Sequence, residues 1–201
     1  MTGRLVVATA NPDKLREIQT IMRGMELDLS PAGELLPGWD VEETGATLCA
    51  NALIKARAAC SATGLPSLAD DTGLFVAALG GGPGIYTARY AGAGCSYRDN
   101  VRKLLMALAR ERGAGRSAEF RTAAALVLPD GEEVCVEGRV CGTIATEPAG
   151  SGGFGYDPVF FSSELKKTFS EATQQQKDSV SHRRRALQEL RRRMERIAGR
   201  V

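Results

Sequence analysis

Residues able to bind an anion lie where a short apolar run near the N-terminus meets a predicted helix. Residues 4–8 have the composition of a buried strand, and Asn11-Pro12 supplies a helix N-cap followed by proline at the first helical position. Free N–H groups at a helix start attract anions, and Lys14 in the first turn adds positive charge. The plain alternative is a helix cap with a solvated lysine. The candidate residues are Thr9, Ala10, Asn11, Pro12, Asp13 and Lys14.

Two pairs of neighbouring carboxylates, Glu42-Glu43 and Asp70-Asp71, lie in separate segments. Mg²⁺ takes oxygen ligands and is usually held by one or two carboxylates together with substrate phosphates, so a fold that brings the pairs together would suit this metal. Asp70-Asp71 follows a short apolar run and precedes Thr72-Gly73, which predicts a position at a strand end, near the edge of a sheet. The alternative is that these residues only cap turns.

A glycine-rich segment, residues 150–158, carries two aromatic residues and a carboxylate. Its glycines match the spacing G-x-G-x-x-G, but Pro158 and the apolar run that follows exclude the helix which a dinucleotide-binding motif must open. The segment predicts instead a loop in which Phe154 stacks on a ring and Asp157 forms hydrogen bonds. A purely structural turn is the alternative.

The last candidate group combines Lys177 with Ser181-His182-Arg183. His182 is the only histidine of the chain, so neither a Ser/His/Asp triad nor a histidine-rich metal site can be built elsewhere. At a helix start it would donate to a ligand, or it would simply be exposed. The motif G-x-x-x-x-G-K-[ST] is absent, which excludes a P-loop nucleotidase.

Helices and strands must position these groups, and they alternate in the first half of the chain. This alternation, followed by a hairpin, favours one α/β domain over residues 1–201 with a mixed sheet covered by helices. Hydrophobic spacing and turn residues predict helices over residues 13–22, 46–63 and 99–112 and another after Ser181, a loop over residues 30–40, a glycine-rich turn over residues 80–84, and a hairpin of residues 120–128 and 134–144.

Composition excludes a membrane protein. Of the 201 residues, 43% are hydrophobic and 25% are charged, as in an ordinary globular domain. Apolar stretches are interrupted well before the roughly 20 residues that a membrane helix needs. The N-terminal segment also lacks the features of a signal peptide, so we expect a cytoplasmic protein.

Cysteine usage indicates neither a disulfide framework nor a zinc site, because the number is odd and no C-x-x-C occurs. Each cysteine lies among apolar or small residues, so we expect reduced thiols that behave as small buried hydrophobes. The five positions are Cys49, Cys60, Cys95, Cys135 and Cys141.

Positive charge is concentrated at the C-terminal end. Residues 177–201 include nine basic and three acidic residues, a charge of +6, which leaves −4 on the rest of the chain. A nucleic-acid binder would use such a segment without Mg²⁺ and with a steep salt dependence. Aromatic residues make up only 5%, and the acidic pairs would repel a phosphate backbone, so we expect no nucleic-acid partner.

Six segments, in order over residues 5–187, together resemble one family: the nucleoside triphosphate pyrophosphatases that remove inosine and xanthosine triphosphates from the nucleotide pool. The segments are VVATANPDKLREI, EETGATLCANALIKA, LADDTGL, GGGPGIYTARYAG, EPAGSGGFGYDPVFF and KDSVSHRRRAL. The resemblance implies an elongated α/β fold with a long mixed sheet, a cleft between two lobes, a homodimer and dependence on Mg²⁺.

The resemblance also implies roles for residues near the phosphates. Asp71 should be the catalytic base and should hold Mg²⁺ together with Glu42 or Glu43. Thr72 should contact the substrate; the family commonly has serine there, and commonly glycine at Ala10. The residues implied to hold the triphosphate are Thr9, Asn11 and Lys14, with Lys55 on the second helix as a further candidate.

Other matching residues are implied to contact the purine. Phe154 should stack on the base. The 6-keto oxygen of the base should accept hydrogen bonds from His182, Arg183 or backbone N–H groups. The 6-amino group of adenine would leave such donors unpaired, at a cost of roughly 1–3 kcal/mol per buried group. The residues implied to line the pocket or reach the nucleotide are Phe154, Gly155, Tyr156, Asp157, Lys177, His182 and Arg183.

The implied reaction is attack of water on a phosphorus, which separates a monophosphate from pyrophosphate. Asp71 would orient or deprotonate the water, and Mg²⁺ would bridge carboxylates and phosphates. A related pyrophosphatase acting on modified pyrimidine or guanine triphosphates is the alternative within the same enzyme class.

Overall fold

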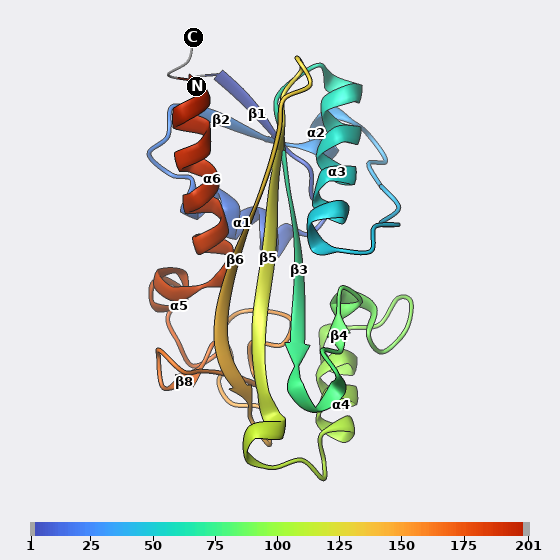
Figure 1. Cartoon of the computed structure of the whole chain (residues 1–201), viewed down its shortest axis with the longest axis vertical. Coiled ribbons are helices and arrows are strands. Elements are labelled where there is room, and N and C mark those ends of the chain that lie inside the picture. The colour runs from blue at the N-terminus through green and yellow to red at the C-terminus, as the bar shows by residue number, and fades with distance from the viewer. Residues whose placement is uncertain (1–2, 199–201) are drawn as a thin grey trace. The chain divides into compact units, whose positions relative to one another are not determined.

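The computed structural model of the chain describes residues 3–198. Residues 1–2 and 199–201, at the two ends of the predicted domain, lie outside the described residues. In chain order the elements (Figure 1) are β1 Gly3–Val7, α1 Pro12–Ile21, β2 Leu27–Pro31, α2 Ala32–Leu35, α3 Leu48–Thr63, β3 Ser67–Val76, η1 Ala77–Leu79, β4 Pro83–Gly84, η2 Thr87–Arg89, α4 Tyr97–Ala107, η3 Gly113–Arg116, β5 Ser117–Val127, β6 Glu133–Ile144, β7 Phe160–Ser162, β8 Lys167–Thr168, α5 Gln174–Val180 and α6 His182–Ala198.

The strands form an eight-stranded sheet in the order β2-β1-β3-β5-β6-β7-β8, with β4 paired to β3. β1 pairs in parallel with β2 and β3, whereas the pairs β3–β4, β6–β7 and β7–β8 are antiparallel. The predicted hairpin is confirmed, because β5 and β6 are neighbours and Gly131, at φ 93°, lies in the turn between them. The prediction of an α/β fold with a mixed sheet flanked by helices is therefore confirmed.

The chain divides into two compact units. The first consists of Met1–Asp71, Thr122–Gly138 and Arg183–Val201, and the second of Thr72–Arg121 and Arg139–His182. The strands β3, β5 and β6 contribute residues to both units. Each unit has its own hydrophobic core.

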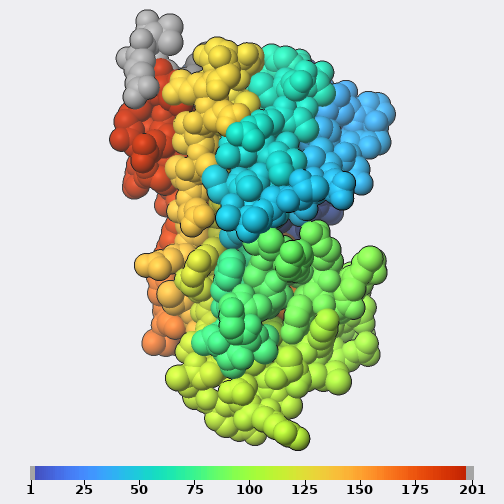
Figure 2. Space-filling view, turned by 45° about the vertical axis from the view of Figure 1, so that its right-hand side comes forward, coloured from blue at the N-terminus to red at the C-terminus, as the bar shows by residue number. Residues whose placement is uncertain are grey.

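In the first unit, helices cover both faces of the strands (Figure 1). Successive side chains of a strand face opposite sides of a sheet. Leu126 of β5 and Val136 of β6 pack in the core that α1 and α6 cover, whereas Cys135 contacts α3 on the other side. Figure 2 shows α3 at the surface, between the segment that precedes it and the β5–β6 turn.

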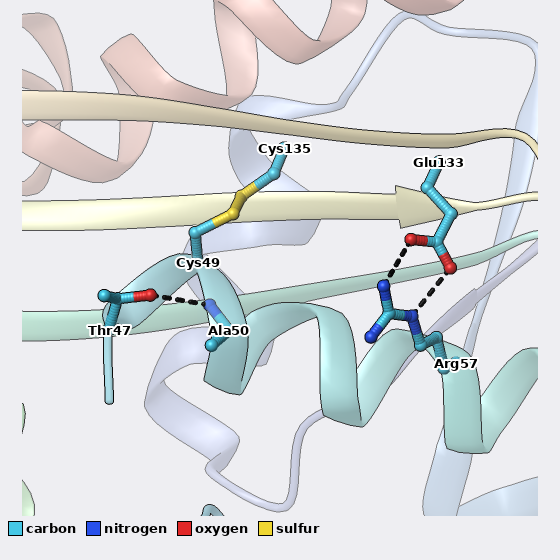
Figure 3. The surroundings of a disulfide bond; sticks show 6 residues. All are labelled: Thr47, Cys49, Ala50, Arg57, Glu133 and Cys135. Atoms are coloured by element: carbon cyan, nitrogen blue, oxygen red, sulfur yellow. Dashed lines mark hydrogen bonds and ion pairs between the residues drawn. A yellow bond between two sulfur atoms is a disulfide. The ribbon is translucent and has the colours of Figure 1, made fainter. Parts of the chain in front are cut away.

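A disulfide joins Cys49, in the first turn of α3, to Cys135 of β6 (Figure 3). The prediction of reduced thiols is wrong for this pair, because the fold brings together two cysteines that are 86 residues apart in sequence, with Cα atoms 6.2 Å apart. Further along α3, Arg57 forms hydrogen bonds of 2.7 and 2.6 Å with the two carboxylate oxygens of Glu133. Both links attach α3 to β6.

The other three cysteines are free. Cys60 is buried, as predicted. Cys141 is exposed and Cys95 is half-buried, so the prediction of burial is wrong at these positions. On β6 buried and exposed residues alternate, and Cys141 falls on the outward-facing set.

The second unit packs α4 against its part of the sheet. Ser96 begins this helix with a capping box, in which its side chain accepts from the Asp99 N–H and the Asp99 carboxylate accepts from the Ser96 N–H. Leu104 of α4 is fully buried in a core that also contains Phe120 and Phe160, whose ring centroids are 4.6 Å apart. The helix predicted over residues 99–112 is thus present but begins and ends earlier.

Two local predictions are wrong. The expected loop over residues 30–40 contains the end of β2 and the short helix α2, because parallel pairing with β1 recruits a segment that has no strand signal of its own. Asp70-Asp71 lies inside β3 rather than at a strand end, because β3 continues into antiparallel pairing with β4. The register between β1 and β3 does end at Leu68, so the aspartates follow the parallel part directly.

Candidate active site

The two neighbouring aspartates of β3 face different helices. Asp70 is fully buried, and its Oδ2 lies 3.3 Å from Nζ of Lys14 on α1 and 3.1 Å from Nη2 of Arg183 on α6. Asp71 faces α3, where Asn51 Nδ2 donates to its Oδ2 at 3.1 Å and Lys55 Nζ lies 3.8 Å from its Oδ1. The alternation of side chains along a strand separates the two carboxylates.

These surroundings shift the pKa values of the two aspartates in opposite directions. Burial disfavours the charged form of Asp70, but the cations of Lys14 and Arg183 outweigh it and hold the pKa well below its ordinary value of 3.8. Burial dominates at Asp71 and raises its pKa, although Lys14 and Lys55 act against that effect. Asp70 therefore stays ionised, whereas Asp71 has the higher affinity for a proton.

Helix α1 begins as predicted and places Lys14 against Asp70. The N-cap Asn11 accepts through Oδ1 from the N–H groups of Asp13, at 2.9 Å, and Lys14, at 3.2 Å. Thr9 Oγ1 accepts from the Asn11 N–H at 3.2 Å. The cap is present, but the lysine is not solvated: its side chain is 15% exposed, and burial lowers its pKa.

Lys55 of α3 lies between two carboxylates. Its Nζ is 2.6 Å from Glu43 Oε1 and 3.8 Å from Asp71 Oδ1. Burial acts against the ammonium, yet the carboxylates of Asp71, Asp70 and Glu43 outweigh it and raise the pKa of Lys55, which stays charged. Glu42 is exposed, so Glu43 is the glutamate that shares a cation with Asp71.

Arg183 is 1% exposed and lies in a buried ion cluster. Its guanidinium pairs with Glu17 of α1, and its Nε donates to Asp70 Oδ2 at 3.1 Å. Glu17 was not among the predicted site residues. The signal that could have found it is its spacing, three residues after Lys14 on the same face of α1.

In the second unit, residues 150–158 form the predicted loop, and β7 follows in place of a helix, which confirms the rejection of a dinucleotide-binding motif. Asp157 is 3% exposed, and its Oδ2 accepts from the Phe154 N–H at 2.9 Å and from Lys177 Nζ at 2.6 Å. The same ammonium lies 4.6 Å from the ring centre of Phe154. The buried ion pair between Asp157 and Lys177 therefore holds the loop in place and sets the Lys177 ammonium against the ring of Phe154.

Two further predicted residues of this unit are held by core contacts. Tyr156 is buried, and its hydroxyl donates to the carbonyl oxygen of Thr87 at 3.0 Å. His182 is 4% exposed and stacks on Phe120, with ring centroids 4.7 Å apart and an interplanar angle of 15°. Gly155, between Phe154 and Tyr156, has a φ of 62°, a conformation that favours glycine.

Residues 5–193 match the model of the Ham1 family. The chain belongs to the Ham1 family. A dITP/XTP pyrophosphatase of Geobacter sulfurreducens is 47% identical over 184 residues, covering 92% of each chain. Another, from Yersinia pestis, is 45% identical over 187 residues, covering 92% of this chain and 94% of the relative. The solved structure of a HAM1 protein from Coxiella burnetii has 39% identity and a TM-score of 0.87, covering 98% of this chain and 100% of that one.

In this Ham1-family chain, each unit holds some of the predicted site residues. Asp71 and Glu43 meet through Lys55 in the first unit, whereas Ala10, Pro12 and Glu42 are exposed. The first unit holds Thr9, Ala10, Asn11, Pro12, Asp13, Lys14, Glu42, Glu43, Lys55, Asp71 and Arg183. The second holds the half-buried Thr72, together with Phe154, Gly155, Tyr156, Asp157, Lys177 and His182.

Within residues 3–198 of this Ham1-family chain, no group of three or more His, Cys, Asp or Glu residues is arranged to hold a metal ion. None of the helices in that range is long and apolar enough to cross a membrane.

Asn51 is a further site residue that sequence reasoning missed. It lies on the face of α3 that also carries Leu48, Ala52 and Lys55. The signal that could have found it is a polar side chain beside the apolar Leu48 and Ala52, because such a group needs a buried partner.

Proposed function

We propose that this protein hydrolyses nonstandard purine nucleoside triphosphates, dITP, ITP and XTP, to the monophosphate and pyrophosphate, and so removes them from the nucleotide pool. The names of the relatives from Geobacter sulfurreducens and Yersinia pestis support the substrate class. The observation that carries the proposal is the buried carboxylate of Asp71, with its raised pKa, beside the ammonium that Glu43 shares. Such a carboxylate is suited to accept a proton from water.

In this proposal the first unit handles the phosphates. Asp71 orients the attacking water and takes its proton. Lys55 and Lys14 neutralise charge on the triphosphate. Carboxylates already hold both ammonium groups in place, so these groups also fix the position of the triphosphate. Thr9 and Asn11 shape the turn before α1 through their capping bonds.

We propose Mg²⁺ as the cofactor, with Glu43 and Asp71 as its protein ligands. Lys55 Nζ lies 2.6 and 3.8 Å from oxygens of these two carboxylates, so the position between them already favours a cation. Two carboxylates suffice, because Mg²⁺ usually completes its coordination with phosphates and water. When bound, the ion would neutralise phosphate charge and lower the pKa of a bound water.

The second unit would recognise the base. Phe154 offers a ring for stacking, and Lys177, His182 and backbone N–H groups of the loop are donors for a 6-keto oxygen. Asp157 holds Lys177 in place through a bond of 2.6 Å. The amino group of adenine would meet these donors without accepting from them, which favours inosine and xanthosine nucleotides over ATP.

We further propose that the protein works as a homodimer in the cytoplasm. Sedimentation velocity would test the first statement, since a dimer has twice the 21.4 kDa mass of the chain. A single species at the mass of one chain would contradict it. Fractionation of cells that express a tagged protein would test the second.

Product analysis tests the activity. Purified protein would be mixed with dITP, XTP, ATP or dUTP, each with Mg²⁺ or with EDTA. We expect monophosphate and pyrophosphate from dITP and XTP, and we expect EDTA or Asp71→Asn to abolish both products. Release of single phosphates would show that water attacks a different phosphorus from the one proposed. Preference for dUTP, or for modified pyrimidine triphosphates added to the same comparison, would support the alternative substrate class.

A further inference from the structure

The side chain of Asn51 links the Asp71 carboxylate to the backbone of Gly45, in the segment that carries Glu43. Asn51 lies near the start of α3, is 1% exposed and follows the N-cap Thr47 by four residues. Its Nδ2 donates to Asp71 Oδ2 at 3.1 Å, and its Oδ1 accepts from the Gly45 N–H at 2.7 Å. A primary amide offers a donor and an acceptor in one rigid plane, so this single side chain makes both bonds.

These two bonds determine how Asp71 is presented. Asn51 holds Oδ2, while the other oxygen, Oδ1, faces Lys55 Nζ at 3.8 Å. Glu43, two residues before Gly45, contacts the same ammonium at 2.6 Å. Asn51 therefore sets the orientation of the carboxylate and the position of the segment that carries its acidic neighbour.

The backbone at Gly45 approaches Asn51 as closely as it can. A Cβ added at Gly45 would lie 2.6 Å from Asn51 Oδ1, 2.9 Å from Asn51 N and 2.7 Å from Ala50 Cβ. No side chain fits in that space, so glycine at this position permits the hydrogen bond. The contact is thus a specific anchor for the segment before α3.

We propose that Asn51 is a positioning residue: it turns the Asp71 carboxylate toward Lys55 and anchors residues 42–45 beside it. This inference rests on the proposed function, in which Asp71 activates water. A carboxylate free to rotate would spend less time in the reactive geometry, and small errors in such geometry lower rates strongly. The loss should fall on kcat, because Lys55 and the groups assigned to the base are unchanged.

Helix α4 provides a matched control. Asn100 also follows its N-cap, Ser96, by four residues, is 2% exposed and accepts from a loop N–H, that of Ala91, at 2.7 Å. Its Nδ2 donates to the carbonyl oxygen of Ala88 at 3.0 Å, rather than to a carboxylate. Removing Asn100 therefore deletes the same kind of anchor without touching Asp71.

The experiment compares Asn51→Ala, Asn51→Asp and Asn100→Ala in the full chain, by the kinetics of dITP hydrolysis and by amide hydrogen exchange. For Asn51→Ala we expect a kcat about 10- to 100-fold lower, a KM within about threefold, and faster exchange over residues 42–47. Asn51→Asp keeps an acceptor for Gly45 but cannot donate to Asp71 when ionised, so exchange should stay slow while kcat falls. Asn100→Ala should keep kcat and change exchange only around residues 88–96.

A kcat for Asn51→Ala within about threefold of wild type would overturn the positioning role, as would equal losses in Asn51→Ala and Asn100→Ala. A wild-type protein that hydrolyses no nonstandard purine triphosphate would instead sink the proposed function. In that case hydrogen exchange still tests whether Asn51 anchors the segment before α3. Unchanged protection of residues 42–47 in Asn51→Ala would reject the anchor, and lost protection would support it.

Discussion

Asp70 and Asp71 lie on the two faces of β3 and differ in how fully nearby cations offset the cost of burying a carboxylate. Asp70 meets two cations, Lys14 and Arg183, and its pKa falls. Asp71 pairs with the ammonium of Lys55, which it shares with Glu43, and burial outweighs the nearby cations so that its pKa rises. Because a strand sends neighbouring side chains to opposite faces, adjacent residues of one type can hold the fold together on one side and do chemistry on the other.

The largest expected effect is that of Asp71→Asn on activity. The amide cannot accept the proton of water, so kcat for dITP should fall by roughly 10³- to 10⁴-fold, near the upper end for general-base catalysis. The free energy of unfolding should change by only about 1 kcal/mol, since a neutral amide avoids the burial cost that the carboxylate carries. Steady-state kinetics and urea unfolding measure both quantities. An Asp71→Asn variant that keeps a tenth of the wild-type activity would contradict the role of Asp71 as proton acceptor.

Asp70→Asn should show the reverse pattern. The substitution leaves Arg183 buried with Glu17 as its remaining acidic partner in the cluster and weakens the hold on Lys14. We expect the free energy of unfolding to fall by about 3–5 kcal/mol, the range for breaking a buried ion pair. Urea denaturation measures it. Unchanged stability together with a collapse of kcat would mean that the roles of the two aspartates are exchanged.

The face of Asp71 has a covalent support, because the disulfide attaches α3 to β6. Reduction should lower the free energy of unfolding by about 2–4 kcal/mol, since it frees a long loop in the unfolded chain. It should leave kcat nearly unchanged, because Asn51 and Lys55 keep their own contacts with Asp71. Urea unfolding with and without a thiol-free reductant tests this, with the double variant Cys49→Ser/Cys135→Ser as the control that reductant must not affect.

The smallest effect is a difference in pH dependence between the two variants. The pKa of Asp70 is lowered in the folded state, so its stabilisation is complete above its ordinary pKa of 3.8 and is lost as the pH falls. The pKa of Asp71 is raised, so its contribution is complete below 3.8 and is lost as the pH rises through the folded-state pKa.

Asp70→Asn should therefore flatten the loss of stability below pH about 4, by at most about 1.4 kcal/mol per pH unit. Asp71→Asn should instead act above pH 3.8, where it removes the stability that the wild type gains as the pH falls toward that value. Urea unfolding between pH about 2.5 and 6 would measure both slopes. Slopes that change in the same direction would contradict the opposite environments of the two carboxylates.

Much of the fold follows from local signals. Asn11-Pro12 predicts the start of α1, helical spacing predicts α3, and a proline-glycine turn predicts the β5–β6 hairpin, all of which are present. β2 was missed because its strand geometry depends on pairing with β1, and the position of Asp70-Asp71 inside β3 depends on pairing with β4. No window of neighbouring residues contains those partners.

Local sequence was enough to predict the element starts, the glycine-rich loop and the segments that resemble one enzyme family, because caps, turns and amphipathic spacing depend on residues within about four positions of one another. Four outcomes depend on tertiary contacts: which aspartate is paired with two cations, which glutamate shares a cation with Asp71, the pairing of Cys49 with Cys135, and the hydrogen bond from Asn51 to the Asp71 carboxylate. These outcomes depend on strand register and on the side chains that separate elements bring together, so they exist only once the sheet and its helices have packed.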